Sequence, residues 1–362
     1  MRLLFVITGI GLGHTIREAA IIDEILKQRP DTRIVIAGFK NSYRYFKGKY
    51  PVLKLKGHKF PEDSFTINRL KLLVMNLPYP LWAAQDKRAL RKLIEEFRPN
   101  KIISDLQPVG ITMAREFNIP SVAIYNVDLQ SLEQFYTQLS FLNKIQSKII
   151  FHYVRKTYAL ADTVIIPRIR LQESNGKIKN VHPIIRALPS EFPQASAVMK
   201  KLKLKQPPIL VMLGGSKFGY RIAEKLITIA KKFDEQFVIF GYKNFKEKNI
   251  TSFTFKENFL EYLKAAKACI LLSGHTALAE CVVYKKPSLV FPFKNYIEHY
   301  LNVHELQECI LTKYIDDTIT EKDLESYIRE LLLKSKALEK KLQHLRFPIN
   351  GAQEAAKVIL KS

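Results

Sequence analysis

A glycine-rich segment near the start of the chain ends in a histidine, and these residue types together suggest chemistry. The segment reads Gly9-Ile10-Gly11-Leu12-Gly13-His14 and lies between an apolar run, Leu3–Thr8, and an amphipathic stretch, Thr15–Gln28. Gly11 and Gly13 permit a tight turn and the close approach of a ligand to backbone N–H groups. An imidazole at this place can take a proton near neutral pH, as an attacking hydroxyl requires. The alternative is a histidine that only caps the following helix; the predicted position in a ligand cleft favours the catalytic interpretation.

Two further glycine turns follow strand-like runs in the second half of the chain. Gly214-Gly215-Ser216 comes after Ile209–Leu213, and Ser273-Gly274-His275-Thr276 comes after Cys269–Leu272. Each turn presents N–H groups and hydroxyls where a helix starts, and a helix N-terminus favours a bound diphosphate. Each turn could also be only a capped helix start. Two of them in one sheet favour a phosphate site.

Glu280 stands one helical turn after Thr276 and is expected to face the same direction. A carboxylate there can accept hydrogen bonds from ribose hydroxyls, although an ordinary surface acid would look the same. A dinucleotide site at the first glycine loop fits less well. The loop departs from G-x-G-x-x-G, and no acid ends the second strand region, Arg33–Ala37, to bind a ribose.

Short apolar runs alternate with longer amphipathic segments and thereby predict how these residues are positioned. Such alternation is typical of βαβ units with a parallel sheet covered by helices on both faces. The expected strands are Leu3–Thr8, Arg33–Ala37, Lys101–Ser104, Ser121–Ile124, Thr163–Ile166, Ile209–Leu213, Gln236–Phe240, Cys269–Leu272 and Ser288–Phe291. The expected helices are Thr15–Gln28, Leu81–Phe97, Pro108–Phe117, Tyr220–Lys232, Asn258–Ala266, Thr276–Val283, Tyr296–Glu308 and Asn350–Lys361.

The pattern runs through two series, so we predict an α/β protein of two doubly wound, Rossmann-like domains. The first covers residues 1–188, a linker covers 189–196, and the second covers 197–347. Residues 348–362 form a closing helix that could return to the first domain. Ligands are expected in a cleft at the carboxyl ends of the strands.

The composition is that of a globular protein, with one unusual feature, a formal net charge of +24. This charge suggests an anionic partner, although a lysine-rich solvated surface explains it equally well. The cysteines are Cys269, Cys281 and Cys309, which are not spaced as a disulfide framework or a zinc site. No apolar stretch is long enough to span a membrane, and the N-terminal run lacks the usual cleavage site. We therefore expect a cytoplasmic protein.

The positive charge is dense between Lys40 and Lys59, where seven Lys or Arg residues and no acids occur among aromatic side chains. An apolar, helix-like stretch that includes Leu70, Leu77 and Trp82 comes next. Cations beside interfacial aromatics suit an anionic membrane surface, and an acceptor that is lipid-linked or phosphorylated would be presented there. The same composition suits nucleic acid, and a solvated loop before a core helix is the third interpretation.

The order of these motifs resembles the GT-B glycosyltransferases, in particular the MurG-like members of glycosyltransferase family 28 and their archaeal relatives. The resemblance covers nearly the whole chain and is most specific from Phe255 to Asn302. This part has an aromatic segment, a helix, a strand ending in Ser-Gly, a Thr-x-x-x-Glu spacing, a strand ending in Pro, and an acidic pair position followed by x-x-Asn.

The resemblance implies a role for each matching residue. Phe255 would cover the nucleotide base, Gly274, His275 and Thr276 would hold the diphosphate together with Ser273 and the Gly214-Gly215-Ser216 turn, and Glu280 would bind the ribose. Glu298 and His299 occupy the place of the pair that contacts the donor sugar, and Asn302 matches the Asn of that motif. His299 replaces the usual Gln, which leaves the donor sugar open. Tyr284-Lys285-Lys286-Pro287 replaces the usual Gly-x-Pro turn.

Asp105 ends the strand Lys101–Ser104, as an aspartate does in UDP-glucosyltransferases of the same fold. By that similarity it would orient His14 as a catalytic base; a cap for the helix near Pro108 is an equal alternative.

The expected activity is inverting transfer of a sugar from a nucleotide diphosphate donor, with uridine favoured by resemblance, to a hydroxyl acceptor. No D-x-D motif is present, and neither a catalytic metal nor a cofactor is expected. A nonhydrolysing sugar-nucleotide epimerase of the same fold and a basic nucleic-acid-binding protein are the alternatives.

Overall fold

The computed structural model describes residues 1–361 except 62–68, 127–132, 134–140, 215–217 and 295. The chain divides into two compact units. The first comprises the described residues of Met1–Pro61, Asn68–Arg186 and Ile349–Ser362, and the second those of Ala187–Pro348. No helix in the described part of the chain is long and apolar enough to cross a membrane.

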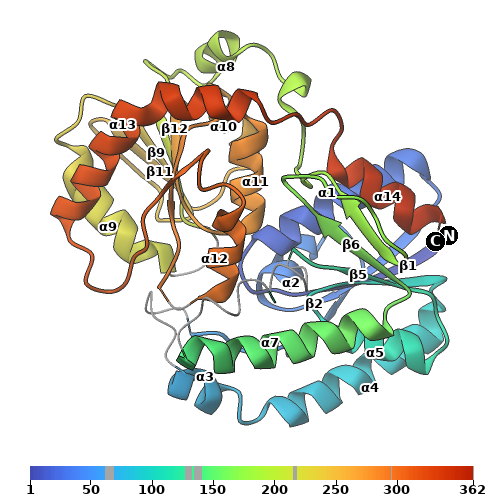
Figure 1. The fold of residues 1–362 in the computed structure, drawn as a ribbon. Coiled ribbons are helices and arrows are strands. Elements are labelled where there is room, and N and C mark those ends of the chain that lie inside the picture. The colour runs from blue at the N-terminus through green and yellow to red at the C-terminus, as the bar shows by residue number, and fades with distance from the viewer. Residues whose placement is uncertain (62–68, 127–132, 134–140, 215–217, 295, 362) are drawn as a thin grey trace. The chain divides into compact units, whose positions relative to one another are not determined.

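The first unit is built on a parallel sheet with the strand order β3-β2-β1-β4-β5-β6-β7 (Figure 1). The strands are β1 (Arg2–Ile7), β2 (Arg33–Gly38), β3 (Val52–Lys54), β4 (Lys101–Asp105), β5 (Ser121–Ile124), β6 (Thr163–Pro167) and β7 (Ile178–Val181). The helices are α1 (Gly13–Gln28), α2 (Lys40–Phe46), α3 (Arg69–Met75), α4 (Tyr79–Phe97), α5 (Pro108–Glu116), α7 (Phe141–Leu160) and α14 (Gly351–Lys361).

Successive side chains of β1 alternate between two apolar cores. Leu3, Phe5 and Ile7 pack with α1 and α14 on one face, whereas Leu4 and Val6 pack with α4 and α5 on the other. A strand points consecutive side chains to opposite faces, so burial on both faces requires a continuous apolar run. This is why the central strands were predictable from sequence.

The second unit repeats the plan with the strand order β10-β11-β9-β8-β12-β13-β14, parallel except for β10 against β11. The strands are β8 (Ile209–Met212), β9 (Phe237–Phe240), β10 (Phe245–Glu247), β11 (Ile250–Phe253), β12 (Ala268–Leu272), β13 (Ser288–Phe291) and β14 (Leu311–Thr312). The helical elements are the 3-10 turn η1 (Pro189–Glu191), α8 (Ala195–Lys201), α9 (Phe218–Ala230), α10 (Phe259–Ala265), α11 (His275–Val283), α12 (Ile297–His304) and α13 (Glu321–Gln343).

The predicted α/β class and the predicted strands are thus confirmed, with differences at the edges. The expected helix Tyr296–Glu308 ends at His304, and its last residues form turns before β14. The short strands β3, β7, β10, β11 and β14, and the helices α2, α7, α8 and α13, were not expected from sequence.

The closing helix α14 completes the core of the first unit. It packs on α1 and β7, and its Ala352, Ala355 and Ile359 are fully buried. The Lys101 ammonium of β4, itself buried, donates to the carbonyl oxygen of Ile359. This hydrogen bond satisfies a carbonyl that the end of a helix leaves without an intrahelical partner.

We predict that Ile359→Ala lowers the free energy of unfolding of the first unit by about 2–4 kcal/mol, because it removes apolar contacts and leaves a cavity. The only tryptophan, Trp82, lies on α4 of this unit, so its fluorescence in urea reports the transition. Leu77→Ala, at a side chain that is 66% exposed, is the matched control and should change the midpoint little. Equal effects of the two variants would contradict the packing role of α14.

Candidate functional site

His14 and Asp105 come together at the carboxyl edge of the first sheet. The β1–β4 register pairs Ile7 with Asp105, so the loop that leaves β1 passes beside the end of β4. His14 is the second residue of α1, and its Nδ1 lies 3.0 Å from Oδ1 of Asp105. The Asp105 side chain is fully buried, whereas that of His14 is 15% exposed. The imidazole can therefore meet a ligand while the carboxylate stays behind it.

The N-caps of α1 and α5 show whether His14 and Asp105 are only helix-capping residues. Leu12 is the N-cap of α1, so His14 is not a capping residue. Gln107 is the N-cap of α5, and the Asp105 oxygens instead contact side chains of α1. Neither residue serves as the cap that the sequence left open as an alternative.

The glycine loop turns as tightly as its sequence suggested. Gly11 has a φ of 72°, in the left-handed region that favours glycine, and its carbonyl accepts a hydrogen bond from the Asn41 side chain at 3.1 Å. A Cβ at Gly9 would lie only 1.7 Å from the Phe39 carbonyl oxygen. Gly13 begins α1. The loop is thus fixed by close backbone contacts that also set the start of α1, and hence His14.

Arg17 joins this pair, and sequence reasoning missed it. Its guanidinium is 2% exposed and contacts both Asp105 oxygens, with Nη2 2.5 Å from Oδ1 and Nε 3.3 Å from Oδ2. The signal in the sequence was the pair Arg17-Glu18 within an apolar stretch of α1, where charged residues are unusual. Spacing of three residues places Arg17 on the same face of α1 as His14.

Burial and neighbouring charges shift the pKa values of the two carboxyl groups of this cluster, Asp105 and Glu18, in opposite directions. Burial disfavours the Asp105 carboxylate, but the Arg17 cation and His14 outweigh it and hold the pKa of Asp105 well below its usual range. Burial, followed by the nearby Asp105 charge, raises the pKa of Glu18. Both Glu18 oxygens are buried without a donor among the described residues. A protonated Glu18 resolves this, because its hydroxyl can donate to Asp105.

The predicted diphosphate site lies at the start of α11 in the second unit. Gly274 is the N-cap, with no side-chain capping bond, and a Cβ there would meet open space. His275 and Thr276 form the first turn, and Glu280 follows on the same helix at 3% exposure. Glu280 is therefore a buried residue, which excludes the interpretation as an ordinary surface acid.

The other predicted donor residues of the second unit lie in different settings. Gly214 has a φ of 71° in the turn after β8, whereas Gly215 and Ser216 lie outside the described residues. Phe255, after β11, is 48% exposed and is free to cover a flat ligand.

Ser273, His299 and Asn302 bind one another rather than standing free. The Ser273 hydroxyl donates to the His299 carbonyl oxygen at 2.9 Å, and the Asn302 amide donates to the Ser273 carbonyl oxygen at 2.8 Å. These bonds tie the turn after β12 to α12. Ser273 and Asn302 thus shape the predicted phosphate turn through its backbone.

The His299 ring is held as a neutral imidazole. The Phe293 N–H donates to its Nδ1 at 3.2 Å, and the ring lies against Phe293 and Tyr296. Burial lowers the pKa of His299 to about 4. With Nδ1 accepting, the proton sits on Nε2, which makes that atom a hydrogen-bond donor. Glu298 accepts a hydrogen bond from the Tyr296 hydroxyl at 2.9 Å.

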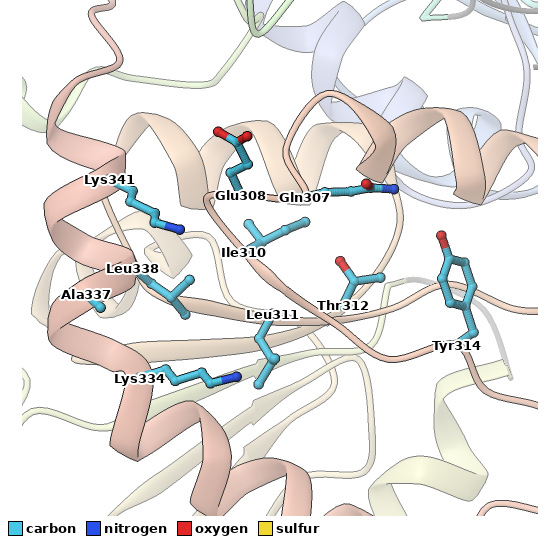
Figure 2. A pocket seen from close by; sticks show the side chains of 10 residues that line it. All are labelled: Gln307, Glu308, Ile310, Leu311, Thr312, Tyr314, Lys334, Ala337, Leu338 and Lys341. Atoms are coloured by element: carbon cyan, nitrogen blue, oxygen red, sulfur yellow. The ribbon is translucent and has the colours of Figure 1, made fainter. Parts of the chain in front are cut away.

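A separate pocket of about 570 Å³ lies in the second unit between β14, the turn after α12, and α13 (Figure 2). Figure 2 shows Lys334 and Lys341 of α13 on one side and Thr312 and Tyr314 on the other. None of the predicted site residues lines it. In the part of the chain that the structure describes, no group of three or more His, Cys, Asp or Glu side chains is arranged to hold a metal ion.

Comparison with known proteins gives a family. A family model described as glycosyl transferase family 1 matches residues 1–332. An uncharacterized glycosyltransferase of Methanopyrus kandleri is 26% identical over 313 residues, covering 83% of this chain and 86% of the relative. The UDP-N-acetylglucosamine–N-acetylmuramyl-(pentapeptide) pyrophosphoryl-undecaprenol N-acetylglucosamine transferase of Thermosipho melanesiensis is 24% identical, covering 98% of this chain and 96% of the relative.

Solved structures agree on the fold. MurG of Acinetobacter baumannii superposes with a TM-score of 0.62 at 14% identity, covering 100% of this chain and 99% of that one. Arabidopsis thaliana UGT89C1 complexed with UDP has a TM-score of 0.64 at 13% identity, covering 99% of each chain. The predicted GT-B architecture and the resemblance to MurG-like and archaeal glycosyltransferases are confirmed.

We predict that acid destabilises the second unit through His299. The unfolded ring takes a proton below pH 6.5, whereas the folded ring stays neutral until about pH 4, so stability present above pH 6.5 is lost as the pH falls toward 4. The loss at pH 4.5 should be about 2.5 kcal/mol. His299→Gln, which cannot titrate, should reduce the difference in urea stability between pH 7 and pH 4.5.

Hydrogen exchange of peptides from β12 and β13 in urea follows this unit alone. His344→Gln, at an exposed histidine of the same unit, is the control and should retain the full pH dependence. An unchanged pH dependence in His299→Gln would show that the pKa of this ring is the same in the folded and the unfolded chain.

Proposed function

The chain belongs to the family described as glycosyl transferase family 1, and from this membership we propose an inverting, metal-independent transfer of a sugar from a UDP-sugar to a hydroxyl acceptor. The enzyme is a glycosyltransferase. The observation that carries the proposed mechanism is the hydrogen-bonded pair of a partly exposed His14 and a buried Asp105. This pair has the arrangement of a base and its orienting acid.

The first unit supplies the base in this proposal. Asp105 accepts a hydrogen bond from the Nδ1–H of His14, which leaves the lone pair of Nε2 for the acceptor hydroxyl. As Nε2 takes the proton of that hydroxyl, the hydroxyl oxygen forms its bond to the anomeric carbon, and the bond from that carbon to the diphosphate oxygen breaks. A single displacement of this kind inverts the anomeric centre.

The second unit binds the donor in this proposal. The first turn of α11 offers N–H groups and the positive end of the helix dipole to the diphosphate, at His275 and Thr276. The same groups stabilise the charge of the leaving diphosphate without the help of a metal. Glu280 binds the ribose, Phe255 covers the uracil, and the Nε2–H of His299 is a donor for the sugar or its phosphate. The UDP bound to UGT89C1, a protein of the same fold, supports uridine.

We also propose that the acceptor is lipid-linked and is reached at an anionic membrane surface. Four apolar side chains of α3, α4 and the turn between them are strongly exposed: Leu73, Val74, Leu77 and Leu81. Beside them the Lys59 ammonium lies 4.6 Å from the centre of the Trp82 ring, at the end of the acid-free basic segment Lys40–Lys59. Apolar side chains beside cations complement a bilayer with anionic head groups.

One experiment distinguishes the proposed role of Glu280 in donor binding from the proposed role of His14 as the base. In EDTA, UDP or a UDP-sugar should raise the melting temperature of the wild-type protein, because a ligand of the native state stabilises it. Glu280→Gln should weaken donor binding about tenfold or more. His14→Ala should leave the donor Kd nearly unchanged but lower turnover by about 10²–10⁴-fold, which is what a general base contributes. Calorimetric titration and release of UDP measure the two effects.

Exposed residues of the same type serve as controls: Glu257→Gln in the second unit and His152→Ala in the first. Full turnover in His14→Ala would remove His14 as the base. Unchanged affinity of Glu280→Gln for every nucleotide sugar would remove the ribose role. No thermal shift with UDP, GDP, dTDP, CDP or their sugars would argue against a nucleotide donor.

Membrane binding is tested with vesicles. The wild-type protein should sediment with vesicles that contain phosphatidylglycerol, less with pure phosphatidylcholine, and less at high salt. Leu77→Glu with Leu81→Glu should weaken this binding about tenfold or more, since both carboxylates would enter the interface. Leu333→Glu, at an 84% exposed leucine of α13, is the control. Salt-sensitive binding of RNA without any binding of vesicles would favour the nucleic-acid interpretation instead.

A further inference from the structure

Arg17 has closer contact with Asp105 than His14 has. Its Nη2 and Nε face the two carboxylate oxygens side by side, at 2.5 Å from Oδ1 and 3.3 Å from Oδ2. This two-point contact fixes the plane of the carboxylate, which a single hydrogen bond from His14 cannot do. The orientation of Asp105, and through it that of the imidazole, therefore depends on Arg17.

Arg17 and His14 also meet directly. Nη2 of Arg17 lies 3.0 Å from Nδ1 of His14, which is itself 3.0 Å from Oδ1 of Asp105. The three atoms form a tight triangle, whereas the two hydrogens of one planar guanidinium nitrogen diverge too widely to serve both neighbours. The ionised oxygen is the stronger acceptor and takes the guanidinium hydrogen. Nδ1 of His14 then donates to Oδ1 as well, and Nε2 keeps its lone pair.

The charges in this cluster decide whether that lone pair survives at neutral pH. A buried carboxylate 3.0 Å from an imidazole favours the imidazolium form, which has no lone pair and is no base. The Arg17 cation, equally close to Nδ1, opposes a second positive charge there. The two charges act on the imidazole with opposite sign, and both lie 3.0 Å from its Nδ1 atom.

The remaining groups that face this cluster do not replace Arg17. Burial and the Asp105 charge raise the pKa of Glu18, on α1, and so disfavour its charged form. The Tyr125 phenol, after β5, is neutral because burial raises its pKa. His58 is neutral because burial, with Lys40 and His14 nearby, lowers its pKa to about 4. Lys40 is a further cation near this cluster, and its charge helps to lower the pKa of His58.

We propose that Arg17 is a positioning residue that keeps His14 neutral and therefore competent as a base, by fixing the Asp105 carboxylate and by opposing proton uptake at the imidazole. The proposal rests on the base role of His14 in the proposed function. It makes Asp105 a hydrogen-bond acceptor whose charge is already balanced. Nε2 of His14 then keeps its lone pair for the proton of the acceptor hydroxyl.

The test is the pH dependence of kcat/KM in variants of Arg17. Arg17→Met should move the acid limb of the profile to higher pH by about one unit or more, since an unbalanced carboxylate would stabilise the imidazolium form of His14, which takes its proton from solvent. Arg17→Gln keeps an N–H donor but no charge, so it should move the limb in the same direction and serves if Arg17→Met does not fold. Arg17→Lys keeps the charge but loses the two-point contact, so it should lower kcat with the limb in place.

Nitrogen-15 NMR of labelled histidine gives a second readout that needs no turnover. The His14 signals, identified by their loss in His14→Gln, should show the proton on Nδ1 in the neutral wild-type ring. The midpoint of the His14 titration should move upward by about one unit or more in Arg17→Met or Arg17→Gln. Arg33→Met, at an exposed arginine at the other end of the sheet, is the matched control and should leave profile and midpoint unchanged.

An unchanged His14 midpoint and acid limb in folded Arg17→Met or Arg17→Gln would overturn the proposal, as would a neutral wild-type ring with its proton on Nε2. A failure of the proposed function looks different. In that case neither the wild-type protein nor any variant would release UDP with any acceptor. The NMR titration would still show whether Arg17 opposes proton uptake by His14.

Discussion

The Asp105 carboxylate has no contact with solvent, and the candidate site of the first unit depends on how this buried ion is held. An ion removed from water needs close partners, and removing one partner of such a pair typically costs about 3–5 kcal/mol. Arg17 and His14 provide these partners from one face of α1. The start of α1 is in turn fixed by the glycine loop, in which Gly9 lies against the Phe39 backbone. The glycine loop, α1 and the Asp105 carboxylate therefore hold one another in place, and His14 is the member of this group that solvent can reach.

The donor site that we propose in the second unit has to bind an anionic ligand instead of a buried carboxylate. A diphosphate brings its own charge, so the protein need not bury an ion of its own but only offers N–H groups and a dipole. In the donor site that we propose, the start of α11 does this at Gly274, His275 and Thr276, and the bonds among Ser273, His299 and Asn302 hold its turn in place. The neutral state of His299 suits this setting, because a charged ring would be costly at such burial.

The sequence allowed more of the fold to be predicted than of the site. Strands such as β1 and β4 are apolar on both faces, and a continuous apolar run is a strong signal. Short strands at or near the sheet edges, such as β3 and β14, carry only two or three residues and no such run. His14 and Asp105 could be predicted together because each ends or follows a strand of the same sheet. Arg17 was missed although its spacing from His14 gave a signal, because its ion pair with Asp105 depends on how α1 is rotated about its axis against β4. Ser273 and Asn302 were expected to touch the donor, but a sequence does not reveal that their polar groups bond each other.

The position of α14 in the first unit has a consequence for how the chain folds during synthesis. The apolar surface of α1 and β7 is covered by residues 351–361, which leave the ribosome only after the entire second unit has been made. Domains generally fold as units in the order of their synthesis. Here the second unit has all its residues available first, whereas the first unit, although begun earlier, waits with an open apolar face until its last helix arrives. A chaperone that shields apolar surface would meet the nascent chain at that face.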